Sequence, residues 1–167
     1  MRNFRMKQIY LWFVCLMALG SGCVEPSRMY YGNSVSPDKV ISIQNGGSHK
    51  GYVETFDVVI NYEFVRDGEV LDIVGQAALS ERNQLLFASL RKLFVYLFFL
   101  DENSRVLETV SLTGALTGDT YERLGFSRTL KVPAGSVGIS FGYSGEANES
   151  NGDGNGGTYT FYRLPLR

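Results

Sequence analysis

The chain has 167 residues, of which 16 are basic, 17 are acidic and 44% are hydrophobic. This length fits one domain with a buried core of its own. Without the three basic residues at positions 2, 5 and 7, the chain has 13 basic and 17 acidic residues, and this acidic balance argues against a nucleic-acid partner, because such proteins carry basic patches. The 11 Phe, 10 Tyr and 19 Gly favour strands and turns over a helical bundle.

The first 22 residues have the organisation of a secretory leader. Three basic residues lie among the first seven, an apolar stretch covers residues 9–19, and residues 20–22 are Gly-Ser-Gly. A cationic start, an apolar region of about 7–15 residues and a small-residue cleavage site define a signal peptide. We therefore expect residues 1–22 to be cleaved off. The alternative, an uncleaved anchor or core helix, is disfavoured because a membrane span needs about 20 apolar residues.

Cys23 follows this leader directly, in the segment Leu19-Gly20-Ser21-Gly22-Cys23. The segment resembles the lipobox of bacterial lipoproteins, in which the cysteine is acylated and becomes the first residue of the mature chain. The resemblance covers residues 1–23 only, and Gly20 stands where that family usually has leucine. It implies that Cys23 is a lipid-attachment site carrying palmitate-type chains. It also implies a mature protein held on a membrane of the cell envelope.

An ordinary signal-peptidase site is the rival interpretation, and it would release a soluble protein with a free thiol at Cys23. Once the leader is removed, Cys23 is the only cysteine, so no internal disulfide can form. An exposed thiol in an exported protein invites oxidation, and acylation explains the lone cysteine better. The residue after it is Val24 rather than aspartate. By the rule of that class, this favours the outer membrane in a host that has two.

The mature chain is expected to contain a tether followed by one domain. Residues 25–39 hold Pro, Gly, Ser and Asn with little apolar periodicity, so residues 23–39 are predicted to be a lipidated cysteine and flexible tether. The β-sandwich domain is predicted over residues 40–167. It is expected to begin with a short strand at 40–43 and a turn region at 44–51.

The clearest local prediction is a hairpin. Residues 52–65 alternate between an almost wholly apolar set, from Tyr52 through Phe56 to Phe64, and a mixed set, as in a strand with one buried face. Arg66-Asp67-Gly68 predicts a tight turn, because Asp-Gly tolerates the positive φ that such turns need. Residues 69–79 then return as the second strand.

Residues 80–100 are ambiguous. Leucines from Leu86 onward fall at helical spacing, and Ser80 is a candidate helix cap. The continuous apolar run 93–100 instead favours a strand buried on both faces. We expect a strand at 92–100 and keep a short helix or turn at 81–90 as a possibility.

The remaining sequence repeats the strand-and-turn pattern. A turn at 101–104 and a strand at 105–112 are followed by a glycine-containing loop at 113–122. Further strands are expected over 126–132, 137–144 and 158–164, with a low-complexity loop over 146–157. About seven or eight strands joined by short turns predict an antiparallel β-sandwich of immunoglobulin-like or jelly-roll-like type.

The residues that could carry chemistry are few. His49, the only histidine, lies in a Gly/Ser/Lys-rich stretch and is expected to be a solvated loop residue. One His and one acylated Cys cannot make a zinc site, and neither a Gly-x-Ser-x-Gly elbow nor a P-loop is present. The segment 151–156 resembles the first half of a calcium loop. The position that should hold its bidentate glutamate is Tyr162, so a hairpin loop is favoured. No catalytic residue, metal or cofactor is predicted.

These observations predict a lipid-anchored envelope protein with a non-catalytic binding or structural β domain that engages other envelope proteins. A carbohydrate-binding module is the alternative, and it requires at least three exposed aromatic rings on one sheet face or loop cluster. The competing expectation is that alternating aromatics fill the core. A hydrolase is the third hypothesis, and it requires His49 in a cleft beside a carboxylate and a hydroxyl. The rings expected in the core are Phe141, Tyr143, Tyr159 and Phe161.

Overall fold

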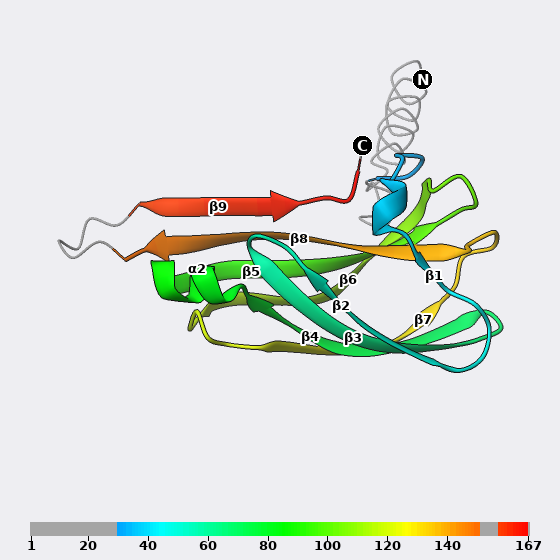
Figure 1. Ribbon diagram of the computed structural model, residues 1–167, viewed down its shortest axis with the longest axis horizontal. Helices are drawn as coiled ribbons and strands as arrows, with labels where there is room; N and C mark the ends of the chain where they lie inside the picture. The colour runs from blue at the N-terminus through cyan, green and yellow to red at the C-terminus, as the bar shows by residue number, and fades with distance from the viewer. Residues whose placement is uncertain (1–29, 151–156, 167) are drawn as a thin grey trace, which may run out of the picture.

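The computed structural model describes residues 30–150 and 157–166, and this part of the chain folds into two antiparallel sheets (Figure 1). Its elements in chain order are the 3-10 helix Pro37–Lys39, β1 (Ile41–Ser42), β2 (Ser48–Glu54), β3 (Val58–Asp67), β4 (Val70–Leu79), α2 (Glu81–Leu86), β5 (Phe87–Leu100), β6 (Val106–Gly118), β7 (Leu124–Lys131), β8 (Gly138–Glu149) and β9 (Thr158–Arg163). The expected antiparallel sandwich is confirmed, with nine strands in the described residues.

The two sheets have different edges. The first has the order β1-β8-β5-β6, and β9 also pairs with β8. The second has the order β2-β3-β4-β7. Because β6 contacts β7, these two edge strands lie on one long side of the sandwich. The other long side is therefore formed by β2 from one sheet and by β1 and β9 from the other.

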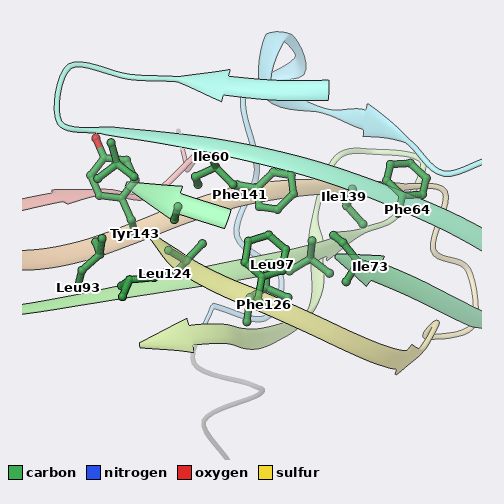
Figure 2. Close-up of a cluster of buried hydrophobic side chains, with 14 of the residues drawn as sticks. Ile60, Phe64, Ile73, Leu93, Leu97, Leu124, Phe126, Ile139, Phe141 and Tyr143 are labelled. Atoms are coloured by element: carbon green, nitrogen blue, oxygen red, sulfur yellow. The ribbon is translucent and has the colours of Figure 1, made fainter. Parts of the chain in front are cut away.

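The main core fills the space between the sheets (Figure 2). Alternate residues of each strand point inward, as the two-residue period of a strand requires. Burial of each large apolar side chain stabilises the fold by about 1.5–3 kcal/mol. The buried set includes Ile60, Phe64, Ile73, Leu93, Leu97, Phe126, Ile139 and Phe141.

A second, smaller core lies on the outer face of the first sheet. It contains Val35 together with Phe98, Leu100 and Val106, and Tyr30 packs against it with its ring 5.6 Å from that of Phe98. Val35 is 1% exposed and pairs with Leu166 in an isolated bridge. The flexible tether was expected to extend through residue 39. The structure corrects this, because residues 30–39 pack against the sandwich.

The β3–β4 hairpin is confirmed, with Gly68 at φ 58° in its turn. The single strand expected over residues 52–65 is wrong, because β2 ends at Glu54 and β3 begins at Val58. The Thr55 hydroxyl accepts hydrogen bonds from the backbone N–H groups of Asp57 and Val58, which closes a turn between the strands. Tyr52 and Phe56, expected on the buried face, are 68% and 56% exposed.

The short helix kept as a possibility at 81–90 is present as α2, and the Ser80 side chain caps it by accepting from the Asn83 backbone N–H. The strand expected at 92–100 is also present, within the longer β5.

The loops expected over 113–122 and 146–157 are partly wrong, since β6 continues to Gly118 and β8 to Glu149. Glycines in both segments favoured loops in the sequence-based prediction, but in the structure they lie within strands. The Phe94 ring lies over Gly114 and the Phe161 ring lies over Gly145, each in the place where a Cβ would stand.

Candidate functional site

A cleft of about 290 Å³ opens on the long side where β2 faces β1 and β9. It forms because the edge of β8 is only partly covered. β1 pairs with Gly138 and Ile139, and β9 pairs from Tyr143 onward, which leaves residues 140–142 without a strand partner on that edge. The lining residues are Asp38, Lys39, Ile41, Tyr52, Val53, Glu54, Thr55, Ile60, Tyr62, Ser140, Phe141, Tyr143, Arg163 and Pro165.

Tyr62 forms much of the floor of the cleft. Its ring contacts Phe141 at 4.9 Å between centroids, and its hydroxyl end lies over Gly51, where a Cβ would collide with it. Burial raises the pKa of Tyr62. The absence of a side chain at Gly51 therefore lets this tyrosine reach from the core to the sandwich edge, with its polar end at the opening.

The inner end of the cleft is closed by a buried hydrogen-bond network. The Tyr143 hydroxyl donates to the Asp57 carboxylate at 3.0 Å, and the Thr55 hydroxyl lies 2.9 Å from the Tyr143 oxygen. The second carboxylate oxygen of Asp57 accepts from the Asn83 side-chain amide at 3.3 Å. The network ties β8 to the β2–β3 turn and to α2. Both hydroxyls, both carboxylate oxygens and the Asn83 amide nitrogen have partners, so the network is structural.

Burial raises the pKa of Tyr143 to about 12. The hydrogen bond from Thr55 acts in the opposite direction, and the negative charge of Asp57 adds to the rise. Tyr143 therefore keeps its proton, and donates it to Asp57, across the physiological pH range.

The outer end, at the mouth of the cleft, contains exposed polar side chains. Arg163, Glu54 and Tyr52 are among its lining residues, and their side chains make no hydrogen bond or ion pair with another described residue. Arg163 lies beside Tyr143, its register partner in the β8–β9 pair. Lys39 and Asp38 add an ion pair of 3.2 Å at the rim. Donors and acceptors thus lie beside aromatic rings in a small concave site, which is the usual composition of a binding pocket.

The arrangement is suited to binding. Two acidic and two basic side chains line the cleft, so it selects no net charge. Among its described lining residues there is no histidine or cysteine, and no group of three or more His, Cys, Asp or Glu in the described ranges could hold a metal ion. The cleft can pair with polar groups of a ligand and cover its apolar parts with tyrosine rings.

His49 lies outside this cleft. The structure corrects its expected place in a turn: it lies within β2, half-buried, with its ring stacked on Phe64 at 5.0 Å between centroids. Its ring has no carboxylate or hydroxyl hydrogen-bond partner in residues 30–150 and 157–166. The geometry that the hydrolase hypothesis required is not formed around His49.

The aromatic residues divide between core and surface. Phe141, Tyr143 and Phe161 are buried as expected, whereas Tyr159 is 37% exposed. Tyr30 packs against the second, smaller core, and its neighbour Tyr31 is 65% exposed. Sequence reasoning missed the cleft residues Tyr52, Tyr62 and Arg163. No local pattern connects them, because the cleft joins segments from residue 38 to residue 165.

A wider hollow of about 570 Å³ lies on the opposite long side, between β6 and β7. Its described lining contains no aromatic ring. The lining residues are Glu69, Glu108, Val110, Thr129, Leu130, Lys131, Val132, Pro133 and Ala134. The cleft beside β2 is the better candidate, since it combines rings with unpaired polar groups.

Two sequence predictions lie outside the described residues: the lipid-attachment site Cys23 and the calcium-like segment 151–156. Within the described ranges, the structure contains no helix of the length and hydropathy that a membrane span requires. No protein-family model, curated protein or solved structure matches the chain.

Proposed function

We propose that this protein is a lipid-anchored cell-envelope protein whose β-sandwich is a non-catalytic binding module. Its partner is another envelope protein, of which an extended segment enters the cleft beside β2. The observation that carries the proposal is the cleft itself: the edge strands β2, β1 and β9 border it, and the side chains of Arg163, Glu54 and Tyr52 form no hydrogen bond or ion pair within the described residues.

The edge of β2 supports an extended polypeptide as the ligand. The backbone N–H of Thr55 donates to the carbonyl of Val58. By antiparallel alternation, every second residue of β2 from Ser48 to Glu54 then directs its backbone groups away from β3. A partner strand can add to such an edge by main-chain hydrogen bonds, with alternate side chains entering neighbouring pockets. A cleft of about 290 Å³ is the size for one or two such side chains.

Site-specific photo-crosslinking tests this partner. A photoreactive phenylalanine analogue at Tyr52 should yield a discrete adduct with one envelope protein in intact cells. The same group at Tyr121, which is 58% exposed and does not line the cleft, is the matched control. Equal adducts from both positions, or none from position 52, would contradict the proposal.

The anchor is proposed from the leader and Cys23. The two or three acyl chains of such lipoproteins bury many methylene groups, each contributing about 0.8 kcal/mol, so attachment is effectively permanent. Val24 favours the outer membrane where the host has two. Intact-mass measurement of membrane-fraction protein should give a chain that begins at Cys23 with added acyl mass. A chain that begins there without that mass would refute the anchor.

A carbohydrate ligand is the second candidate, and the composition of the cleft favours it. Sugar hydroxyls both donate and accept, which matches a lining with Arg163 and Glu54, and the Tyr52 and Tyr62 rings can cover apolar sugar faces. Titration with soluble oligosaccharides tests it through the unfolding midpoint. A saturable rise that Tyr52→Ala abolishes would support a sugar ligand, and no rise with any glycan would reject it.

A further inference from the structure

The outer face of the β1-β8-β5-β6 sheet is divided into two halves. One half is covered by the chain's own ends, since Tyr30 and Val35 from the N-terminal side and Leu164 and Leu166 from the C-terminal side form or pack against the small core that contains Phe98. Within the described residues, neither end of the chain covers the other half. It presents Tyr162 and Leu116, which are 70% and 71% exposed, and the partly buried Phe94 ring. Tyr96 lies at the boundary, since its partly buried ring also packs against the small core.

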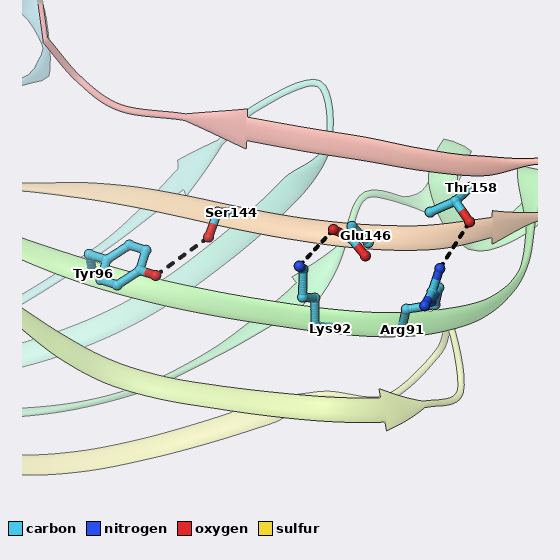
Figure 3. A network of polar contacts seen from close by, with 6 residues as sticks. All are labelled: Arg91, Lys92, Tyr96, Ser144, Glu146 and Thr158. Carbon is cyan, nitrogen blue, oxygen red and sulfur yellow. Dashed lines mark hydrogen bonds and ion pairs between the residues drawn. The ribbon is translucent and has the colours of Figure 1, made fainter.

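The uncovered rings lie on one continuous surface. Phe94 of β5 pairs with Ser144 of β8, which pairs with Tyr162 of β9, so these three side chains form one row across the sheet. Gly114 beneath Phe94 keeps that ring close to the sheet. The Tyr96 hydroxyl lies 3.4 Å from the Ser144 hydroxyl (Figure 3). A short serine between larger rings gives a shallow aromatic surface rather than a pocket.

The charged side chains beside this surface include one more basic than acidic residue. Arg91 donates to the Thr158 hydroxyl at 3.1 Å, and Lys92 forms an ion pair of 2.6 Å with Glu146 (Figure 3). The outer face of the other sheet has more acidic than basic side chains. By strand register these are Glu63, Asp67 and Asp72, with Glu54 at the cleft rim, against Lys50 and Lys131.

The position of the N-terminal segment limits how far this face can be from the anchor. Six residues, and so seven Cα-to-Cα steps, separate Cys23 from Tyr30, which packs on Phe98. In any conformation they span at most about 25 Å. Tyr96 and Phe94 lie two and four residues from Phe98 along β5, or about 7 and 13 Å. A membrane that holds Cys23 is therefore within reach of the uncovered half.

We propose that the uncovered half of this outer face, formed by Phe94, Tyr96, Leu116 and Tyr162, rests on the headgroup region of the membrane that carries the anchor. The inference rests on the proposed acylation of Cys23. Tyrosine and phenylalanine rings favour the boundary between headgroups and acyl chains, and Arg91, whose charge is in excess over the Lys92–Glu146 pair, attracts anionic headgroups. The more acidic face of the other sheet then points away from the lipid, and the cleft opens at the side.

Fluorescence quenching in vesicles tests this orientation. The acylated protein is reconstituted in vesicles of phosphatidylethanolamine and phosphatidylglycerol that contain headgroup spin-labelled lipid. Cys23 is the only cysteine of the mature chain and is blocked by acylation, so one added cysteine can carry a fluorophore. Thr160→Cys in β9 reports on the proposed face and Ser127→Cys in β7 on the other sheet; both positions are exposed. Quenching should be several-fold stronger at position 160 than at 127.

A double variant checks that the aromatic surface causes the orientation. Leu116→Ser with Tyr162→Ser changes two exposed side chains and should lower quenching at position 160 to the level at 127. Val74→Ser, at a side chain 46% exposed on the other sheet, should leave it unchanged. Equal quenching at both positions in the unaltered protein would overturn the orientation while leaving the anchor intact. Protein that fails to float with the vesicles would overturn the anchor, and the orientation with it.

Discussion

The closed, inner end and the open, outer end of the cleft beside β2 use similar side chains in opposite ways. At the closed end, the Tyr143 hydroxyl, the Asp57 carboxylate and the Asn83 amide satisfy one another. At the open end, the Tyr52 hydroxyl and the Arg163 guanidinium form no hydrogen bond or ion pair with a described residue. A buried polar group must be paired to avoid a penalty of about 1–3 kcal/mol, whereas a group open to water need not be. The comparison assigns stability to one end and binding to the other.

The largest expected effect is at the closed end. Asp57→Ala removes the acceptor of both Tyr143 and Asn83 and leaves two buried donors unpaired. We expect the free energy of unfolding to fall by about 2–4 kcal/mol, measured by urea denaturation. Glu54→Ala, which removes a nearby exposed carboxylate without partners, is the matched control and should change stability little. Equal losses from the two variants would break the comparison.

Measuring the free energy of unfolding against pH further distinguishes the closed end of the cleft from the open end. The folded-state pKa of Tyr143 is raised to about 12, above its ordinary value of 10.0. Its contribution to stability is therefore complete below about pH 10 and lost as the pH rises toward about 12, on the order of 2 kcal/mol. Tyr143→Phe lacks this group, so its deficit relative to the natural chain should shrink between pH 9 and pH 12. A deficit that stays constant over this range would refute the assignment.

Gly51→Ala tests the shape of the cleft floor that Tyr62 forms. The added methyl group takes the space of the Tyr62 hydroxyl end, so the ring must shift. Because a flexible side-chain end can move, we expect a cost of only about 1 kcal/mol. Crosslinking from position 52 should fall, since the floor of the cleft has changed. Gly125→Ala in β7, where a methyl group meets nothing within 4 Å, is the control and should affect neither measurement. An unchanged adduct yield would show that Tyr62 does not shape the site.

The smallest effect on stability is expected at the open end. Arg163→Ala and Tyr52→Ala remove exposed side chains without partners, and each should change the free energy of unfolding by less than about 0.5 kcal/mol. Thermal and urea unfolding provide the measurement. A loss as large as that of Asp57→Ala would show that these residues are structural, and the division between the ends would be withdrawn.

The fold was predictable from sequence where the signals were local. Strand alternation and Asp67-Gly68 identified the β3–β4 hairpin, and Ser80 identified the start of α2. The break at Thr55 was missed because the apolar alternation continues across the turn, from Tyr52 to Phe56 and beyond. Only the hydrogen bonds to the Thr55 hydroxyl reveal the turn. The extents of β6 and β8 were missed because cross-strand rings cover Gly114 and Gly145.

The candidate site was beyond local patterns. Tyr62 reaches the cleft edge only because Gly51 lies opposite it on β2, and Arg163 lies there only because β9 covers the second half of β8. Both facts depend on strand order and register, which composition and periodicity do not specify. The tether length was overestimated for the same reason. The polar composition of residues 25–39 predicted a flexible segment, although Val35 pairs with Leu166, which lies far away in the sequence.

The most direct test of the central claim is the crosslinking yield from position 52 in a chain that also carries Arg163→Ala. We predict that the adduct with the envelope partner is lost while the unfolding midpoint stays that of the natural chain. This result would show that the open end of the cleft binds and does not stabilise. An undiminished adduct at an unchanged midpoint would contradict the assignment of this end to binding.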